Sequence, residues 1–361
     1  GLGLSWPRRM KYSIPPLRLR LLGLFLVLVL GIGCPCVRSA VNASPGLRWW
    51  LFSNFGAQRM CPEMLKRGVP LKLVPNGNTV GRLYPEQCNY QVNDQLQTVT
   101  LSFSGSGSAW TPIAGRIGFT VATSVQYGMD FYMAEDSIYI WAKPRSVPFG
   151  PEFKVAAIEN KLVNWAAQGP AGYLATTFGS QIAQSQIASG FTVIHADSGD
   201  EFALGQIQPP QHPPKPFNLP SGSHYAFVND TTEVRSEQID MLGPFEVTES
   251  GQALFCRFRL TGPSLDVLVV RRGTGDLWRS GLQLGQPLAQ PPEAPVMQFP
   301  LMPGNEQRQK IPLPPGQYYV VLDNSSKVGS VNPPWNPLGV VGGNTAVAAH
   351  VIELGDADDA F

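Results

Sequence analysis

Four histidines are the side chains of this sequence best suited to acid–base chemistry or metal binding: His195, His212, His224 and His350. None has the spacing of a recognised metal motif, and none accompanies a Gly-x-Ser-x-Gly nucleophile turn. A triad assembled in space stays open, because triads are defined by geometry and not by chain order. The sequence thus carries no catalytic signature. It favours a protein without enzymatic activity and indicates no cofactor.

An acidic turn beside His195 comes nearest to a metal site. Asp197, Asp200 and Glu201 supply carboxylate oxygens, which calcium prefers as ligands. Their spacing matches no EF-hand loop, and turns favour Asp, Ser and Gly for backbone reasons alone. We therefore expect an ordinary turn between two short strands, with a calcium site as the alternative.

Cysteine chemistry depends on the compartment. The chain has no C-x-x-C pair, so zinc ribbons and thioredoxin-like chemistry have no support. If Cys34 is lipidated and Cys36 lies in a tether, Cys61 and Cys88 are the natural disulfide partners in an oxidising compartment. Cys256 falls in an alternating apolar stretch, which predicts a buried, inert thiol.

The stretch Leu21–Cys34 predicts that compartment. Basic residues precede it, and its apolar run has the length of a signal peptide, short of the about 20 residues that a spanning helix needs. Its end, Gly31-Ile32-Gly33-Cys34, resembles the lipobox of bacterial lipoproteins, which implies lipidation of Cys34. Ordinary cleavage after Ser39 or Ala43, giving a secreted protein, is the alternative.

Composition excludes some partners. The net charge is +1 and only 15% of residues are charged, whereas nucleic-acid binding needs a concentrated basic face. We therefore expect no nucleic acid, but the membrane through the lipid anchor and an envelope protein as partners. The 37 glycines and 34 prolines favour many short strands joined by irregular loops.

The fold class that we expect is mainly β with some α. An N-terminal α+β domain, with an antiparallel sheet plus two helices, precedes a C-terminal β-sandwich. The predicted divisions are an upstream extension (1–9), a signal peptide (10–33), a tether (34–46), the α+β domain (47–207), a Pro-rich linker (208–223), the sandwich (224–354) and an acidic tail (355–361).

Local patterns carry this assignment. Apolar residues occupy the odd positions of Ile117–Met133, which predicts a long strand. Apolar residues at helical spacing predict helices over Val155–Ala167 and Tyr173–Ile187. The run Ser104–Ser108 alternates Gly and Ser, lacks the lysine of a phosphate-binding loop and predicts a flexible turn.

The last third of the chain resembles a known class of sandwich. Leu265-Asp266-Val267-Leu268-Val269, followed by Pro315-Gly316-Gln317-Tyr318-Tyr319, is similar to bacterial pre-peptidase C-terminal domains and GOLD-type domains. In those folds an aspartate-led strand precedes a Pro-Gly-x-Tyr strand. The resemblance implies a non-catalytic module for attachment, folding or partner contact.

Three hypotheses about function follow. The favoured one is a non-enzymatic, exported and lipid-anchored protein of the bacterial cell envelope, facing the periplasm or in the outer membrane, that binds a protein partner or ligand. The second is an extracytoplasmic hydrolase with a sandwich as accessory domain. The third is a lipid or small-molecule carrier, which needs a sizeable apolar cavity.

Overall fold

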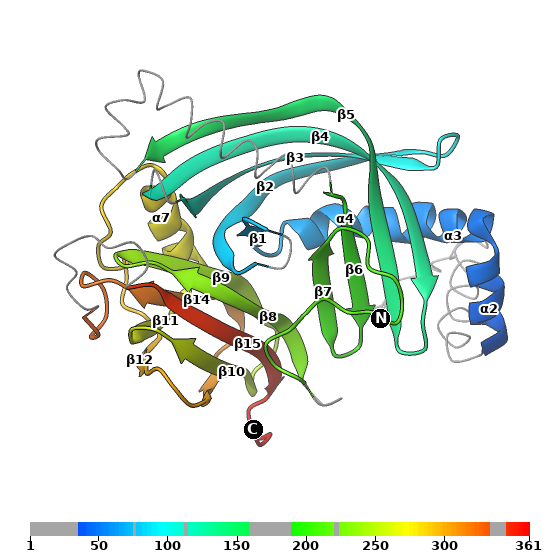
Figure 1. The fold of residues 1–361 in the computed structure, drawn as a ribbon. Helices are drawn as coiled ribbons and strands as arrows, with labels where there is room; N and C mark the ends of the chain where they lie inside the picture. The colour runs from blue at the N-terminus through cyan, green and yellow to red at the C-terminus, as the bar shows by residue number, and fades with distance from the viewer. Residues whose placement is uncertain (1–34, 75–76, 112–114, 159–188, 220–223, 333–343) are drawn as a thin grey trace, which may run out of the picture. The chain divides into compact units, whose positions relative to one another are not determined.

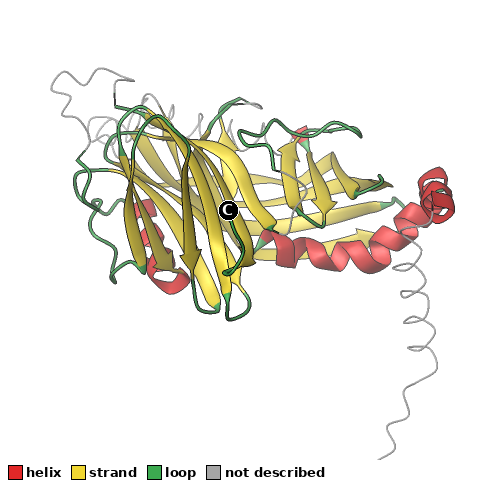
Figure 2. Ribbon diagram, turned by 90° about the horizontal axis from the view of Figure 1, so that it is seen from below, coloured by secondary structure: helices red, strands yellow, loops and turns green. Residues whose placement is uncertain are grey.

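The computed structural model describes residues 35–74, 77–111, 115–158, 189–219, 224–332 and 344–361. The chain is mainly β with some α, as predicted, and strands dominate the ribbon (Figure 2). The described residues fall into two compact units, which divide between Arg48 and Trp49. Within the described ranges, no helix is both long and apolar enough to cross a membrane. The predicted signal peptide and Cys34 lie outside those ranges.

The described chain begins with helices. α2 (Pro35–Ala43) and α3 (Pro45–Leu51) each start at a proline, the residue whose fixed φ suits a first helical position. A π-helical turn, η1 (Phe52–Gly56), and α4 (Ala57–Met64) continue the chain. Most of the predicted tether, 34–46, is therefore helical.

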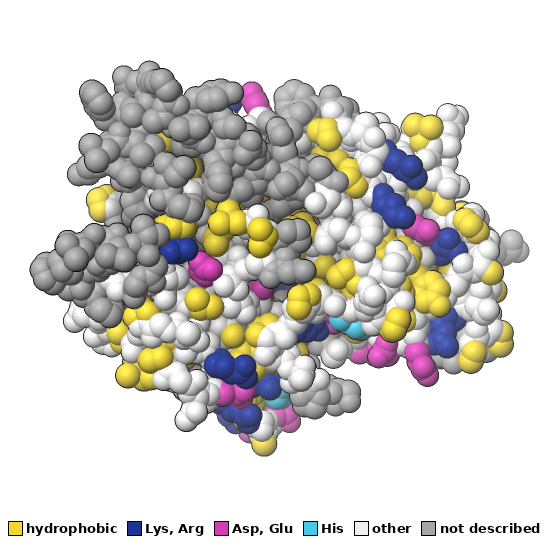
Figure 3. All heavy atoms as spheres, in the orientation of Figure 1, with side chains coloured by type: hydrophobic (Ala, Val, Ile, Leu, Met, Phe, Trp, Pro, Cys, Tyr) yellow, Lys and Arg dark blue, Asp and Glu magenta, His cyan; other side chains and the backbone are white. Residues whose placement is uncertain are grey.

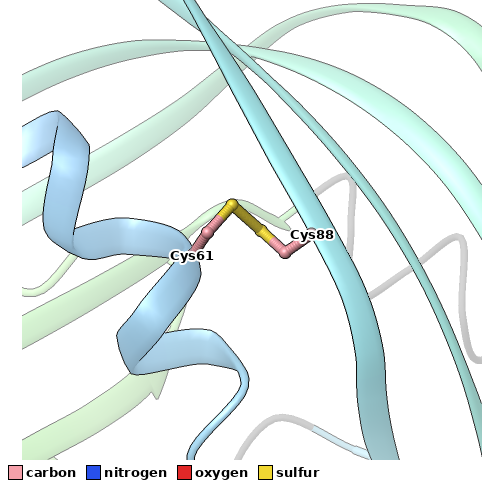
Figure 4. The surroundings of a disulfide bond; sticks show 2 residues. All are labelled: Cys61 and Cys88. Atoms are coloured by element: carbon pink, nitrogen blue, oxygen red, sulfur yellow. A yellow bond between two sulfur atoms is a disulfide. The ribbon is translucent and has the colours of Figure 1, made fainter.

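The predicted disulfide between Cys61 and Cys88 is confirmed (Figure 4). It joins α4 to β2 (Thr79–Asn93), with the two Cα atoms 5.3 Å apart. It closes a loop across 27 positions, which stabilises by roughly 3–4 kcal/mol in the chain-entropy model. The disulfide thus fastens α4 to β2 covalently.

The long strands β2 to β5 form an arched sheet (Figure 1). They pair antiparallel in chain order: β1 (Val69–Lys72), β2, β3 (Thr98–Thr111), β4 (Gly115–Met133), β5 (Ser137–Ile158), β6 (Phe191–Ala196) and β7 (Gly199–Leu204). The alternation over Ile117–Met133 is confirmed, because its odd-numbered side chains are buried along β4. One face of this strand is therefore core.

The turn predicted at Ser104–Ser108 is wrong, because these residues lie inside β3. The glycines are there for close packing. A Cβ at Gly105 would lie 2.4 Å from the carbonyl oxygen of Tyr84, and one at Gly107 would lie 2.5 Å from that of Arg82. Only glycine lets β2 and β3 approach this closely.

The first predicted helix is wrong over its first four residues, since Val155–Ile158 ends β5. Its helical spacing has another cause. Gly118 pairs with Ala157 but Phe119 pairs with Val155, so the register skips Ala156. This bulge turns Val155 and Ile158 toward the same side, against Ile117. The rest of that helix, and Tyr173–Ile187, lie outside the described residues.

The C-terminal half is the predicted β-sandwich. One layer has the order β8-β15-β10-β13 and the other β12-β11-β14-β9, with a shared hydrophobic core between them. The strands are β8 (Tyr225–Val234), β9 (Gln238–Val247), β10 (Gln252–Thr261), β11 (Leu265–Arg271), β12 (Met297–Leu301), β13 (Gln307–Pro312), β14 (Gly316–Asn324) and β15 (Ala346–Asp356).

A helix that the sequence analysis missed, α7 (Arg272–Gln283), covers the outer face of the second layer. The ring of Tyr319 lies against Gly275, and the Tyr319 hydroxyl donates to Asp276 at 2.7 Å. At the other end, a Cβ on Gly118 would lie 2.0 Å from the carbonyl oxygen of Gln283. The helix therefore packs between the sandwich and β4.

One continuous sheet joins the N-terminal strands to the sandwich. β7 pairs with β8 at Gly199 and Ala226, and β8 also pairs with β2 at Thr79 and Thr232. The sequence of pairings from β2 through β8 therefore returns to β2. Both parts belong to the compact unit 49–361.

The described part of the predicted linker, 208–219, lies along the sheet and is fastened to it. The Trp141 indole donates to the carbonyl of Ile207 at 2.6 Å, and the Tyr139 hydroxyl donates to that of Gln211 at 3.1 Å. Phe217 is buried, and its backbone exchanges two hydrogen bonds with the amide of Asn229. This segment is therefore a docked strap.

Two buried carboxyl groups face each other within the sandwich. Asp266 of β11 pairs in register with Asp323 of β14, and both are almost fully buried. Asp266 accepts hydrogen bonds from the backbone of Ser330 and Val331, whereas one oxygen of Asp323 has no hydrogen-bond partner among the described residues. Burial, with the Asp266 charge adding to it, raises the pKa of Asp323 to about 7.

This arrangement makes stability depend on pH. Folded Asp323 keeps its proton up to about pH 7, while the unfolded residue loses it near pH 4, so its stabilising contribution is complete below pH 4 and is lost as pH rises to 7. Between pH 4 and pH 7 we expect the free energy of unfolding of the wild type to fall by roughly 2–4 kcal/mol more than that of Asp323→Asn. Chemical denaturation at several pH values measures this difference. Asp358→Asn, in the exposed C-terminal segment, is the control. Equal pH profiles for wild type and Asp323→Asn would contradict the assignment.

Candidate functional site

The predicted calcium ligands are not brought together. Asp200 contacts the ring of His195 and accepts from the Tyr225 hydroxyl at 3.2 Å, whereas Glu201 contacts His212 and Lys215. Neighbours on a strand point to opposite faces, so Asp200 and Glu201 of β7 diverge. Within the described ranges, no three His, Cys, Asp or Glu side chains are grouped to hold a metal ion. The described residues therefore offer no calcium site that includes Asp197.

The contact between His195 and Asp200 is electrostatic. Its hydrogen bond raises the pKa of His195. Burial disfavours the Asp200 carboxylate, but hydrogen bonds from His195 and Tyr225 lower its pKa. The pair fastens the β6–β7 hairpin to the start of β8.

One further histidine has the contacts of a proton relay. His212 Nε2 lies 3.2 Å from the Tyr139 hydroxyl, and His212 Nδ1 lies 3.1 Å from a Glu201 carboxylate oxygen. Burial raises the pKa of Tyr139, and its hydroxyl also donates to the strap. The hydroxyl is therefore protonated, enclosed and already bonded, which suits a structural clamp better than a nucleophile.

The last two histidines are packed in the sandwich. His350 is fully buried, and burial lowers its pKa, so it is neutral. Its Nδ1 lies 3.1 Å from the carbonyl oxygen of Ala348. The ring of His224 stacks on Phe255, with 4.0 Å between centroids. Neither arrangement offers an open face for chemistry.

A polar pocket lies where the arched sheet, the sandwich and α7 meet. Its volume is about 50 Å³. Its polar lining comes from five separate parts of the fold: Arg82 on β2, Ser108 and Trp110 on β3, Arg116 on β4, Thr232, Glu233, Arg235, Gln238 and Asp240 on or between β8 and β9, and Arg279 on α7. Four arginines thus share one small space.

Arg82 forms the fixed wall of the pocket. Its guanidinium binds Asp240 through two hydrogen bonds of 2.9 Å and reaches the Thr232 hydroxyl at 3.2 Å. Burial opposes its charge, but Asp240 outweighs burial and raises the pKa of Arg82. The nearby Tyr84 hydroxyl donates to the Met241 carbonyl at 2.6 Å. These bonds join β2 to β9.

Arg235 and Arg279 are held differently. The Arg235 guanidinium lies 3.8 Å from the centre of the Trp110 ring and binds Glu233 at 3.0 Å. The Arg279 guanidinium lies 4.2 Å from the centre of the Tyr84 ring and donates to Ser106 at 3.1 Å. In both side chains the Nε–H group is buried and finds no acceptor among the described residues. The Arg279 guanidinium also lies 3.6 Å from a carboxylate oxygen of Asp276 and 3.8 Å from one of Glu86.

The pocket gathers arginines and carboxylates in one small space. Its lining holds four arginines and two carboxylates, Glu233 and Asp240. Arg279 is further paired with Asp276 at 3.6 Å and with Glu86 at 3.8 Å. The face drawn in Figure 3 likewise shows charges of both signs among hydrophobic side chains. Guanidinium groups that share one space suit the binding of a small anion.

Sequence reasoning missed this site. Its arginines stand singly at positions 82, 116, 235 and 279, so no basic run marks them.

No protein-family model matches the chain, and none of the curated proteins compared with it matches. The site therefore depends on the geometry alone.

The ion pair between Arg82 and Asp240 generates a test. We expect Asp240→Ala to leave a buried guanidinium without compensation and to lower the free energy of unfolding by roughly 3–5 kcal/mol. Glu306→Ala removes the partner of the half-exposed Arg308 and should cost about 1 kcal/mol or less. Chemical denaturation measures both. Similar losses for the two variants would contradict a special role for the buried pair.

Proposed function

We propose that this protein is a non-enzymatic, exported binding protein of the bacterial cell envelope, and that its ligand is an anion held in the arginine-lined pocket. The observation that carries the proposal is the gathering of four arginines, from β2, β4, the connection between β8 and β9, and α7, around one small pocket. Guanidinium groups form charge-assisted hydrogen bonds with anionic oxygens, and these are stronger than neutral hydrogen bonds.

Export is supported by two features. The segment Leu21–Cys34 has the form of a signal sequence, and the disulfide between Cys61 and Cys88 is the kind of bond that persists in oxidising compartments. Lipidation at Cys34 would place the protein on a membrane facing the periplasm or in the outer membrane. Release after ordinary cleavage would make it secreted.

Binding is favoured over hydrolysis and over lipid carriage. The contacts of His212 with Tyr139 and Glu201 hold the strap, with the hydroxyl enclosed and protonated. The arginine-lined pocket, at about 50 Å³, is far smaller than the about 300–1,000 Å³ of a site for a drug-sized molecule. A small charged group fits it, whereas a lipid chain does not.

The location has a direct test. Mass spectrometry of the mature protein should find a diacyl- or triacyl-modified Cys34 at its N-terminus. Cys34→Ser should then shift the protein from the membrane fraction to the soluble fraction. A free, unmodified terminus near Val41 or Ser44 would refute the anchor and leave the secreted form.

Anion binding is tested by thermal unfolding with phosphate, sulfate, citrate, acetate and glucose at matched ionic strength. We expect at least one of the anions to raise the melting temperature of the purified protein, because a ligand that binds only the folded state stabilises it. Glucose is the neutral control. If no anion raises the melting temperature above the effect of chloride, the proposed function is wrong.

A further inference from the structure

We infer that the open face of the helix formed by residues 49–64 rests on the surface of a lipid bilayer, with the indole of Trp50 inserted among the headgroups. This inference rests on the proposed location in the cell envelope and is independent of the anion site. Three observations carry it: the fastening of the helix, the exposure of an aromatic pair and the short stretch of chain that separates this pair from the predicted anchor.

The helix has one buried and one open face. It consists of the end of α3, η1 and α4, which follow one another without a break. The side chains buried along it are those of Trp49, Phe52, Ala57 and Cys61. Cys61 is bonded to β2 (Figure 4), and the Trp49 indole donates to the carboxylate of Asp94, just after β2, at 3.0 Å. Because these two bonds hold one side of the helix to the sheet, the helix cannot turn to bury its other side.

Trp50 lies on the open face. Its neighbour Trp49 is buried, whereas 40% of Trp50 is exposed. Phe55 lies against it, with 5.8 Å between the ring centres in an edge-to-face arrangement. Residues five apart point in different directions in an α-helix, but the wider turn of η1 brings these two rings together. Tryptophan combines a large apolar ring with one polar N–H group, and it is therefore enriched at the boundary between bilayer and water.

The turn beside this helix also carries an exposed apolar side chain. Residues 94–97 join β2 to β3, and Leu96 within them is 64% exposed. The backbone N–H of Leu96 donates to the side chain of Asn93 at 3.0 Å, which fixes the turn. The bond between Trp49 and Asp94 keeps the turn next to the helix. Two separate elements therefore offer apolar side chains in the same part of the molecule.

Acidic groups in this region are few and are each bound to a donor. Glu63 is the first acidic residue of the sequence, and Lys66 binds it at 2.6 Å. Asp94 accepts the hydrogen bond of the Trp49 indole. Between positions 49 and 62 the charged residue of the sequence is Arg59, and it is exposed. An anionic headgroup therefore meets little repulsion here.

The predicted anchor brings this face to the bilayer. The apolar run ends at Cys34, and Trp50 follows 16 positions later. Because α2 and α3 make most of this stretch helical, the chain from Cys34 to Trp50 spans only about 25 Å. A tether this short raises the local concentration of the bilayer around Trp50, so a contact that is weak alone becomes populated. A lipid chain and a second contact together also anchor more firmly than either one.

The test is quenching of tryptophan fluorescence by phosphatidylglycerol vesicles whose acyl chains carry bromine, a quencher that acts on contact. The purified mature protein is held on the vesicles by its lipid, or is added to them if it has none. We expect the vesicles to quench the wild type and Trp50→Phe to lose most of that quenching. Trp50→Phe keeps a ring against Phe55, and circular dichroism and the melting temperature establish that it is folded.

Introduced reporters locate the contact. In the Trp50→Phe protein, Leu96→Trp should restore quenching, because the turn lies next to the helix. Leu277→Trp is the matched control, since Leu277 is 70% exposed but lies on α7, and it should stay unquenched.

A polar substitution measures the strength of the contact. With Leu96→Trp as reporter, Trp50→Ser should lower the ratio of docked to undocked protein about tenfold, because it removes most of the apolar area that enters the bilayer. Leu277→Ser with the same reporter should leave the ratio unchanged.

The membrane contact and the anion site fail separately. Trp50 does not line the pocket, so Trp50→Phe should keep any rise in melting temperature that anions cause in the wild type. If Trp50→Phe is quenched as strongly as the wild type, or if Leu96→Trp is quenched no more than Leu277→Trp, the inference is wrong and the open face belongs to a protein partner. Quenching that depends on Trp50 supports the membrane contact even where no anion binds.

Discussion

The buried ion pair between Arg82 and Asp240 is the interaction on which the rest of the structure depends. It joins β2, in the arched sheet, to β9, in the sandwich layer that belongs to a different sheet. Both charges lose water on burial, so the pair adds specificity more than net stability. Once this register is fixed, Tyr84 lies against Arg279 and Arg235 lies close by, and an arginine-lined pocket results.

Sequence patterns predicted elements whose signal is local. The alternation along β4, the strands of the sandwich and the bond between Cys61 and Cys88 are of this kind. The patterns gave wrong predictions where contacts with distant residues determined the local structure. A bulge at Ala156 made strand residues look helical, and close packing against β2 made the Gly/Ser run of β3 look like a turn.

The candidate site was hidden for a related reason. The sequence drew attention to histidines and carboxylates, which fold into clamps around the strap and the β6–β7 hairpin. The arginines of the pocket look like ordinary surface residues one by one, and their spacing follows no helical or strand period. These arginines come together only when the chain folds and elements separated by about 150 positions meet, as β2 and β9 do at the ion pair between Arg82 and Asp240.

The closure of the strand order on β8 has a consequence for how the chain folds. The pairs from β2 to β7 are neighbours in sequence, so they form early as successive hairpins, whereas the contacts of β2 with β8 and β9 span more than 150 positions. A chain that is synthesised from its N-terminus presents the arched sheet first. That sheet must wait, with its edge at β7 unpaired, until the sandwich arrives to complete it.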